Sequence, residues 1–507
     1  MRNFRFASML LLFILFGVDA EQQRGVAQWS SNPSQNLKVA GGGINPEICI
    51  DGCGGCFIVW ETGTVGNRRL LRMQHLNRYG YKSFPETGIP LASGEFDQST
   101  PFFLTYGGEG TAIVLFYDTR FLASKFVART LVQRVDTTGT LLWGTSAIRP
   151  TQSDSSQTPT ALLADGNGGA FVFWAEDRNG DGAQEMFGNR ITADGQLLWE
   201  QDGRKFADYA YNYIRTQVAT DSAGGLFIAY TQISGIVIHH IDGKGQFVWS
   251  APIPMSIGIW GALASDNSGG FFWVAHEQIA YRPPKGPIYR TRAFRYNHAG
   301  VSLWPVEGIA ITDSAYQQTF TPEVIVNDRQ DVAIVYRTLS TPYDNVHVQR
   351  ITFNGELRFE YGGRPVSTYP AARAIKQTCL GSNRKITVVW RDGRAQKGDL
   401  YAQSLDHNGN QIWDDDIAVT LRPDSERSHR ISSDGNGGCI VTWYEIGTGS
   451  GWGIFAQQVS RNGRLGEVIA TSVTSSREGQ HTRIPLIFSL FPNPFTDSVR
   501  FSVVSTR

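Results

Sequence analysis

The stretch that decides the fold is Asp165-Gly166-Asn167-Gly168-Gly169-Ala170-Phe171-Val172-Phe173-Trp174. A turn rich in glycine leads directly into a short apolar run. Glycine and asparagine tolerate the positive φ angles of tight hairpin turns. A strand that is apolar throughout is typical of one buried on both faces, because a strand with one wet face alternates. The stretch therefore predicts a hairpin whose second strand lies between two packed layers.

The same phrase returns along the chain, in strong copies and in weaker ones. The last residue of each copy serves as a landmark, and the eight landmarks are Trp60, Phe116, Trp174, Tyr230, Ala275, Tyr336, Trp390 and Trp443. Their spacing of 45 to 61 residues is far longer than a β-helix repeat and is typical of propeller blades. The sequence thus predicts an all-β chain folded as an eight-bladed β-propeller.

The alternative is a seven-bladed propeller, in which the short fifth unit has collapsed. The interval of 45 residues before Ala275 is followed by one of 61, and together they equal two ordinary repeats. That pattern favours a shifted loop within eight blades.

A second phrase follows each copy, namely a glycine with an aromatic residue four positions later. Phe84 and Phe359 keep this spacing, whereas the eighth copy, at Gly463, has no aromatic residue. An extra copy lies at the N-terminus, where Gly25 precedes Trp29. We expect the tryptophans of this phrase to be structural and mostly buried, within the fourth strand of each blade: Trp29, Trp143, Trp199, Trp249, Trp304 and Trp413.

The extra N-terminal copy predicts how the ring closes. The last blade lacks a good fourth strand, and unpaired strand edges invite aggregation. We expect residues 26–31 to pair with residues 453–459, which places Trp29 in the same sheet as Phe455. The propeller would then be closed by an N-terminal strand.

The segment Asp136-Thr-Thr-Gly-Thr-Leu-Leu-Trp143 resembles the tryptophan-docking repeat of quinoprotein-type eight-bladed propellers. The resemblance implies that each tryptophan packs across the gap between blades. Quinoprotein chemistry is not implied, because the cofactor pocket of that family commonly has an adjacent cysteine pair and this sequence has none. We expect no organic cofactor.

The two ends of the chain differ in composition from the repeats. Residues 1–20 read as a signal peptide, with Arg2 and Arg5 before an apolar run that is too short to span a bilayer. The propeller occupies residues 21–470, and a polar linker follows over residues 471–485.

The tail, residues 486–507, contains Leu490-Phe-Pro-Asn-Pro-Phe495 and then an alternating strand. It resembles the start of a type IX secretion (Por) sorting domain of Bacteroidota, truncated because the later strands are missing. The resemblance implies the type IX secretion machinery as a partner and a secreted or outer cell-surface location.

Charge and composition exclude some function classes. Lys and Arg number 46 and Asp and Glu also number 46, so the net charge is zero and no basic surface for nucleic acid is indicated. No later stretch is apolar enough for a membrane span. Cysteines 49, 53 and 56 lie close together, so we expect any disulfide of Cys56 to be local, with Cys49 opposite it or Cys53 across the turn, and not with Cys439.

One metal candidate is present. Asp177, Asn179 and Asp181 have the spacing of a calcium loop, in which alternate oxygen side chains converge on the ion. The twelfth position is Gly188 and not the bidentate glutamate, so a polar hairpin loop is the favoured interpretation and calcium the weak alternative.

Two further patterns are interpreted as structural. Charged pairs recur after the second strand, at Asp118-Thr-Arg120, Asp177-Arg178 and Asp392-Gly-Arg394, and indicate ion pairs that brace loops. His239 and His240 are adjacent, so in a strand they point to opposite faces and do not share a metal.

The sequence contains no complete catalytic motif. The leading hypothesis is therefore a non-catalytic propeller that binds a protein or glycan. The alternative is an extracellular hydrolase or lyase with a carboxylate site on one propeller face. An enzyme should bring two or three carboxylates together, with one in an apolar setting that raises its pKa.

Overall fold

The computed structural model describes residues 28–467, apart from residues 63–68, 95–96, 99, 123–124, 209–215, 233–234, 256–260, 283–285, 313–318, 327–330, 339–344, 371–372, 381–383, 395–397, 424 and 448–451. The expected signal peptide, linker and sorting-domain tail lie outside these residues. Every regular element described is a β-strand, and the part of the chain that is described contains no helix suited to crossing a membrane.

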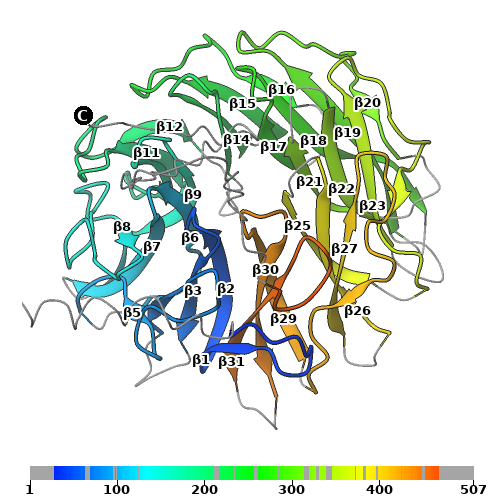
Figure 1. Cartoon of the computed structure of the whole chain (residues 1–507). Coiled ribbons are helices and arrows are strands. Elements are labelled where there is room, and N and C mark those ends of the chain that lie inside the picture. The colour runs from blue at the N-terminus through cyan, green and yellow to red at the C-terminus, as the bar shows by residue number, and fades with distance from the viewer. Residues whose placement is uncertain are drawn as a thin grey trace, which may run out of the picture.

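The strands form eight antiparallel sheets arranged in a ring, which is an eight-bladed β-propeller (Figure 1). The strands of the first four blades follow in chain order. Blade 1 is β2 (Gly43–Ile50), β3 (Cys56–Thr62), β4 (Leu71–Leu76) and β5 (Ile89–Pro90); blade 2 is β6 (Phe103–Gly108), β7 (Thr111–Leu122) and β8 (Lys125–Asp136); blade 3 is β9 (Gln157–Ala164), β10 (Ala170–Glu176), β11 (Glu185–Ile191) and β12 (Arg204–Asp208); blade 4 is β13 (Gln217–Thr220), β14 (Leu226–Gln232), β15 (Gly235–Ile241) and β16 (Ile253–Met255).

The other four blades complete the ring. Blade 5 is β17 (Gly261–Ser265), β18 (Phe271–Arg282), β19 (Gly286–Tyr296) and β20 (Ile309–Ala310); blade 6 is β21 (Thr319–Val326), β22 (Asp331–Thr338), β23 (Asn345–Thr352) and β24 (Arg364–Pro365); blade 7 is β25 (Arg373–Leu380), β26 (Ile386–Asp392), β27 (Asp399–Leu405) and β28 (Ile417–Ala418); blade 8 is β29 (Ser425–Ser433), β30 (Cys439–Ile446), β31 (Gly453–Val459) and the N-terminal β1 (Leu37–Gly41).

The repeat read from the sequence coincides with the blades. Each of the eight landmarks lies in the second strand of a different blade, so the prediction of eight blades is confirmed and the seven-bladed alternative is wrong. The first strands of successive blades contact one another around the axis. The apolar core consists of eight clusters, each shared by two neighbouring blades, which is why the second strands are apolar on both faces.

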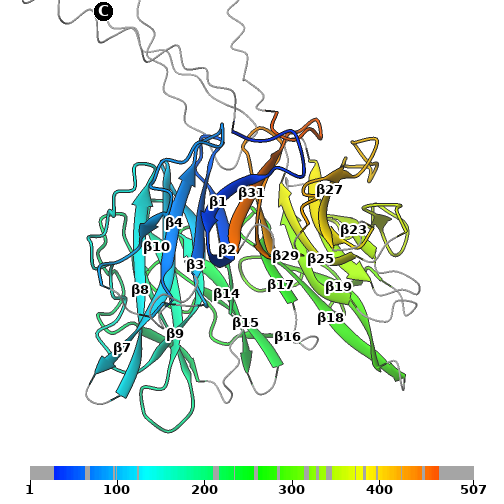
Figure 2. The ribbon, with the colours of Figure 1, turned by 90° about the horizontal axis from the view of Figure 1, so that it is seen from below.

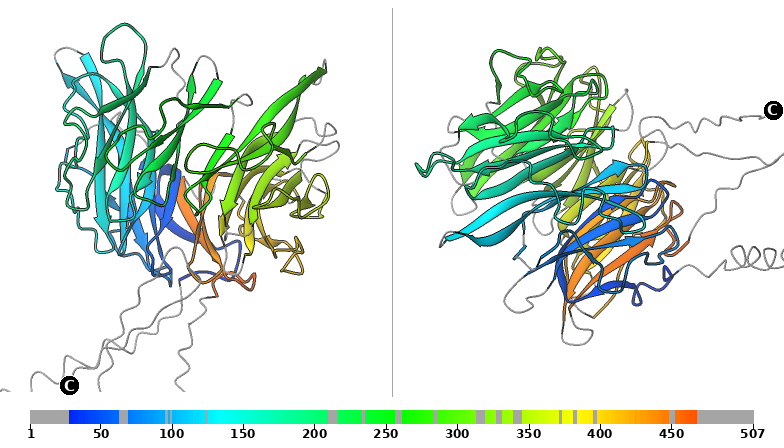
Figure 3. Two further views of the ribbon diagram at one scale, coloured as in Figure 1. Left: turned by 90° about the horizontal axis from the view of Figure 1, so that it is seen from above. Right: turned by 90° about the vertical axis from the view of Figure 1, so that its left-hand side faces the viewer.

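The two faces of the ring differ in their connections. The face with the Asp-Gly turns between first and second strands, such as residues 51–55, is called the turn face here. The opposite face, with the hairpins between second and third strands, is called the loop face. The long hairpins β7–β8 and β18–β19 extend toward the loop face (Figure 2). In Figure 3 the sheets stand side by side with their strands running between the two faces.

The ring is closed by an N-terminal strand, as expected, but by a different one. β1 pairs antiparallel with β31, with Lys38 opposite Phe455, so the expected pairing of residues 26–31 was wrong. The reason is that the docking tryptophan precedes the outer strand and does not lie in it. Trp199, for example, comes before β12, which starts at Arg204. The outer strand consequently begins several residues later than predicted.

Trp29 nevertheless occupies the docking position of blade 8. Its indole Nε1 donates to the backbone carbonyl of Arg78 in blade 1 at 3.0 Å. The side-chain amide of Gln457 in β31 donates to the carbonyl of Ser30. The N-terminal segment therefore supplies both the docking tryptophan and the outer strand that the eighth unit lacks.

Candidate functional site

The turn face carries a repeated contact between neighbouring blades, which we call the interblade latch. In it the docking tryptophan of one blade donates from Nε1 to a carbonyl in a turn of the next blade. Trp199, for example, donates to the Gly243 carbonyl at 3.1 Å. Arg190 on the third strand donates to the same carbonyl at 3.2 Å and forms an ion pair with Asp165. The turn aspartate thus orients the second donor of the latch.

The same construction recurs at other seams. Arg295 and Trp304 share the Phe353 carbonyl, and Asp266 pairs with Arg295. In blade 4 a histidine replaces the arginine, since His240 contacts Asp221 at 2.9 Å. The turn aspartates accept backbone hydrogen bonds from the residues two and four positions later, which fixes the turn.

The seam between blades 6 and 7 departs from this pattern in three ways. Five residues before the landmark, the strong copies have a glycine that leaves no room for a side chain, because a Cβ atom added there would lie within 2.4 Å of a carbonyl oxygen. Blade 6 has Asp331 at this position. Six residues before the landmark, blade 7 has Arg384 with φ of 62°, where blades 1 to 5 and 8 have glycine. A non-glycine residue in this region costs about 1 kcal/mol or more, so it is retained at sites where the side chain matters.

The third departure is Phe359, which stands in the docking position of blade 6. Its ring lies against Gly409 of blade 7, as Trp199 lies against Gly245 of blade 4. A phenyl ring has no N–H for the latch and is smaller than an indole. Arg350, the third-strand arginine, donates to the carbonyl of Arg384, in the turn between the first two strands of blade 7. The tryptophan donor of the latch is therefore absent at this seam, and the arginine contacts a carbonyl in a different turn.

A cavity of about 410 Å³ lies at this altered seam. It is the candidate functional site, and we call it the seam cavity. Its lining comes from two blades, with the outer part of blade 6 on one side and the turns of blade 7 on the other. The lining residues are Asp331, Arg358, Phe359, Arg364, Arg384, His407 and Asn408.

The charged groups of the seam cavity are held in fixed positions. Arg350, which is fully buried, donates from Nη1 to the Asp331 carboxylate at 2.8 Å. Arg384 also forms an ion pair with Asp331. Arg358 reaches to 4.0 Å from the same carboxylate and is about half exposed. Such an arrangement can bind an anion by several charge-assisted hydrogen bonds.

A second polar cluster lies at the loop-face end of blades 7 and 8. Glu426 in β29 is opposite Glu445 in β30, and neither side chain is exposed. Glu445 accepts from Trp443 and Arg422. The two carboxyl oxygens of Glu426 have no hydrogen-bond partner among the described residues. Burial, with the nearby carboxylates of Asp399 and Glu445, raises the pKa of Glu426 to about 8.

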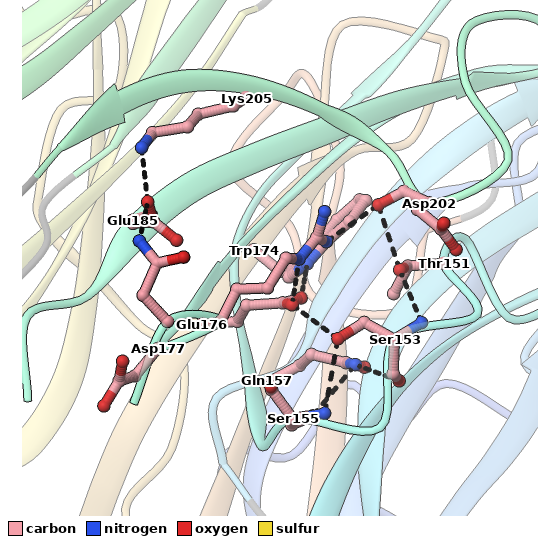
Figure 4. A network of polar contacts seen from close by, with 12 residues as sticks. Thr151, Ser153, Ser155, Gln157, Trp174, Glu176, Asp177, Glu185, Asp202 and Lys205 are labelled. Carbon is pink, nitrogen blue, oxygen red and sulfur yellow. Dashed lines mark hydrogen bonds and ion pairs between the residues drawn. The ribbon is translucent and has the colours of Figure 1, made fainter. Parts of the chain in front are cut away.

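Two other carboxylates at this end of the blades, Glu176 and Asp392, each accept several hydrogen bonds. Glu176 accepts hydrogen bonds from Trp174 at 2.8 Å, Ser153 at 2.6 Å and Arg178 at 2.6 Å (Figure 4). Asp392 is held in the same way by Trp390 and Arg394, and these bonds contribute to a lowered pKa of Asp392. Such contacts brace the second strand against its loops.

The expected loop-bracing ion pairs have three different outcomes. Asp392 and Arg394 form the predicted pair at 2.7 Å. Arg178 instead pairs with Glu176, the last residue of β10, and not with Asp177. The side chain of Arg120 lies outside the described set.

The calcium candidate lies in the β10–β11 hairpin loop. Asp177 accepts from the backbone N–H groups of Gly180 and Gly182, and Asp181 accepts from that of Ala183. Asn179 donates to Glu185 in β11. These contacts describe a polar hairpin loop held by its own side chains, and no group of three metal-binding side chains occurs in the part of the chain that is described.

The cysteines and histidines are also placed. Cys49 is opposite Phe57 and Ile50 is opposite Cys56, so the expected position of Cys49 opposite Cys56 was wrong by one residue. The two thiols face different sides of the sheet, and Cys49, Cys53 and Cys56 are not in disulfides. His239 and His240 do face opposite sides, and burial lowers the pKa of His239 to about 4.

Sequence reasoning missed the arginines of the seam cavity. The available signal was the loss of the Gly-Gly pair in two adjacent blades, together with phenylalanine in the docking position of the first of them. In a repeat protein the units pack in equivalent environments, which favour the consensus residue at each position. A departure from the consensus therefore indicates a candidate functional residue.

No protein-family model and no curated protein sequence matches the chain. Among solved structures, it is similar to an ulvan lyase (12% identity over 85% of this chain and 97% of that one, TM-score 0.45) and to the polysaccharide lyase Uly1 (13%, 87% and 94%, TM-score 0.38). It is also similar to a protein of unknown function from Dyadobacter fermentans (10%, 84% and 98%, TM-score 0.37). Identities this low concern the fold alone, and the fold that the chain itself displays is an eight-bladed β-propeller.

Proposed function

We propose that this protein is a non-catalytic binding propeller and that its ligand occupies the seam cavity between blades 6 and 7. One observation carries the proposal. At the seam between blades 6 and 7 three residues of the repeat are replaced, and the replacements, Asp331, Phe359 and Arg384, all line one cavity. Arg384 keeps a backbone conformation that glycine adopts more easily, and its side chain pairs with Asp331 at the cavity.

The first test restores the tryptophan that the repeat has at the docking position. Phe359→Trp places an indole where other blades have one, next to the turn at residues 406–409. We expect the indole to fill part of the cavity and to weaken ligand binding by about tenfold or more, while a new hydrogen bond to the turn stabilises the fold by about 1 kcal/mol. Ligands are found on glycan and peptide arrays with the full chain, and affinities are measured by calorimetry.

The matched control is Phe84→Trp. Phe84 is the docking residue at the seam between blades 1 and 2, where Gly139 lies against its ring. The same change of side chain there should leave ligand affinity unaltered. Equal binding by wild type and Phe359→Trp would remove the seam cavity from the proposal.

A second candidate function rests on Glu426. A carboxylic acid whose burial raises its pKa to about 8, so that it stays protonated at neutral pH, has the properties of a general acid in a hydrolase or lyase. Incubation with neutral and acidic polysaccharides tests it: an enzyme should release products, and Glu426→Gln should abolish the release. Retained activity in that variant would exclude Glu426 as the acid.

We further propose that the protein acts outside the cell. The support is the signal-like segment over residues 1–20 and the resemblance of residues 486–507 to a type IX sorting domain. Both segments lie outside the described residues. Fractionation of the source cells tests the location.

A further inference from the structure

We infer that the ligand of the seam cavity presents an anionic group with at least two oxygens, namely a carboxylate, a sulfate or a phosphate. The inference rests on the proposed function and names the chemistry of that same site. It follows from a comparison of charges between this seam and the regular seams of the ring.

At a regular latch the turn aspartate is matched by one cation. Asp165 pairs with Arg190, and Asp266 pairs with Arg295. At the seam cavity a single carboxylate, Asp331, faces several guanidinium groups. Two of them, Arg350 and Arg384, bind it directly. Among the described residues that line the cavity, arginines therefore outnumber carboxylates.

Two more arginines add to this excess from the outer side of the cavity. Arg358 is 4.0 Å from Asp331, and Arg364 lines the wall with its guanidinium 5.9 Å from the centre of the Phe359 ring. No other carboxylate lines the cavity among the described residues. Like charges gathered in a partly enclosed space repel one another, and a bound anion relieves that repulsion.

The geometry suits an oxyanion in particular. A guanidinium presents its N–H groups as a planar fork that matches carboxylate, sulfate and phosphate oxygens. Arg384, which lines the cavity, is held by Asp331, and the buried Arg350 holds Asp331 in turn, so little freedom is lost when a ligand binds to Arg384. The exposed His407 and Asn408 at the rim offer further polar contacts to the remainder of the ligand.

The test uses the full chain and three kinds of probe. Sodium sulfate and sodium phosphate represent free anions, glucuronate represents an acidic sugar, and glucose is its uncharged counterpart. We expect glucuronate or the inorganic anions to bind and glucose not to bind, with affinity falling as salt is raised. Tighter binding of glucuronate would identify an acidic sugar as the source of the anion, and tighter binding of sulfate or phosphate a free anion.

The decisive variant is Arg364→Gln, because Arg364 is exposed and its loss should not disturb folding. We expect it to weaken binding of the charged probe at least about tenfold. The matched control is Arg204→Gln in β12, at the equivalent position of blade 3, where Arg204 contacts Gln246 and no such cavity is involved. That variant should bind as the wild type does.

Two results would overturn the inference in distinguishable ways. If uncharged glycans bind and Phe359→Trp blocks them, while Arg364→Gln has no effect, the binding function stands and the anionic ligand is wrong. If no probe or array ligand binds at the seam cavity at all, the proposed function itself fails.

Discussion

Replacing Glu426 with glutamine should stabilise the protein by roughly 5 kcal/mol at pH 8 and above, and hardly at all near pH 4.5. The buried carboxyl has its pKa raised to about 8 from an ordinary value of 4.5. The unfolded chain therefore ionises this group at a lower pH than the folded chain does. Stability due to the protonated group is complete below pH 4.5 and is lost as the pH rises toward 8. Glutamine does not ionise and removes this loss.

Burial and the surrounding charges together explain why the pKa of Glu426 is raised. The carboxylates of Asp399 and Glu445 disfavour a second negative charge, and Arg391 offsets them only partly. His429 on the same strand acts in the opposite sense, since burial lowers its pKa to about 4 and its stabilising effect is lost as pH falls from about 6.5. Because His429 is present in both proteins, the difference between wild type and variant isolates Glu426.

Urea unfolding from pH 5 to pH 9 measures the difference. A suitable control is Glu86→Gln, because the Glu86 side chain is 82% exposed. The control should run parallel to the wild type. Parallel curves for Glu426→Gln as well would mean that Glu426 is already ionised in the folded protein.

Trp199→Ala should cost about 3 kcal/mol of stability, the lower end of the penalty for removing a core aromatic side chain, because Trp199 is only partly buried. Its indole packs against Phe171 and Phe206, with ring centres 5.8 and 5.5 Å away, and donates to the Gly243 carbonyl of the next blade. Truncation therefore opens a void between blades 3 and 4 and removes one latch donor.

Two other variants separate these contributions. Trp199→Phe keeps the ring and loses the N–H, so it should cost only about 1 kcal/mol, as the natural Phe84 and Phe359 suggest is tolerable. Trp452→Ala is the surface control, since that side chain is 49% exposed and should contribute little. Chemical unfolding measures all three, and a loss near zero for Trp199→Ala would contradict its structural role.

The regular parts of the fold could be predicted because the same sequence pattern occurs in eight units. The glycine turns and apolar second strands recur at intervals of 45 to 61 residues, so one misread copy is corrected by the others. The outer strand β1 was misplaced because it carries no residue of the repeat phrase. Its identity depends on pairing with β31 at the other end of the chain, which local patterns do not encode.

The sites were harder to predict because their residues, like β1, depend on packing between blades, which local patterns do not encode. Glu426 belongs to the stretch Ser425-Glu-Arg-Ser-His-Arg-Ile-Ser-Ser433, which reads as a polar, exposed strand. Its burial arises from packing between blades 7 and 8. The positive φ angle of Arg384, which glycine adopts in other blades, likewise appears in the structure and not in the sequence.

The pairing of β1 with β31 also sets an order of events in time. Leu37 pairs with Ala456, which is about 400 residues later in the chain, so β1 has no partner strand until that residue has been synthesised. At roughly 5–20 residues per second, synthesis alone separates the two strands by tens of seconds. Blades 1 to 7 can assemble during that interval, each on its predecessor. Until the last hairpin arrives, the growing arc keeps open edges at both ends, and this is the stage at which the protein is most prone to join with another copy of itself.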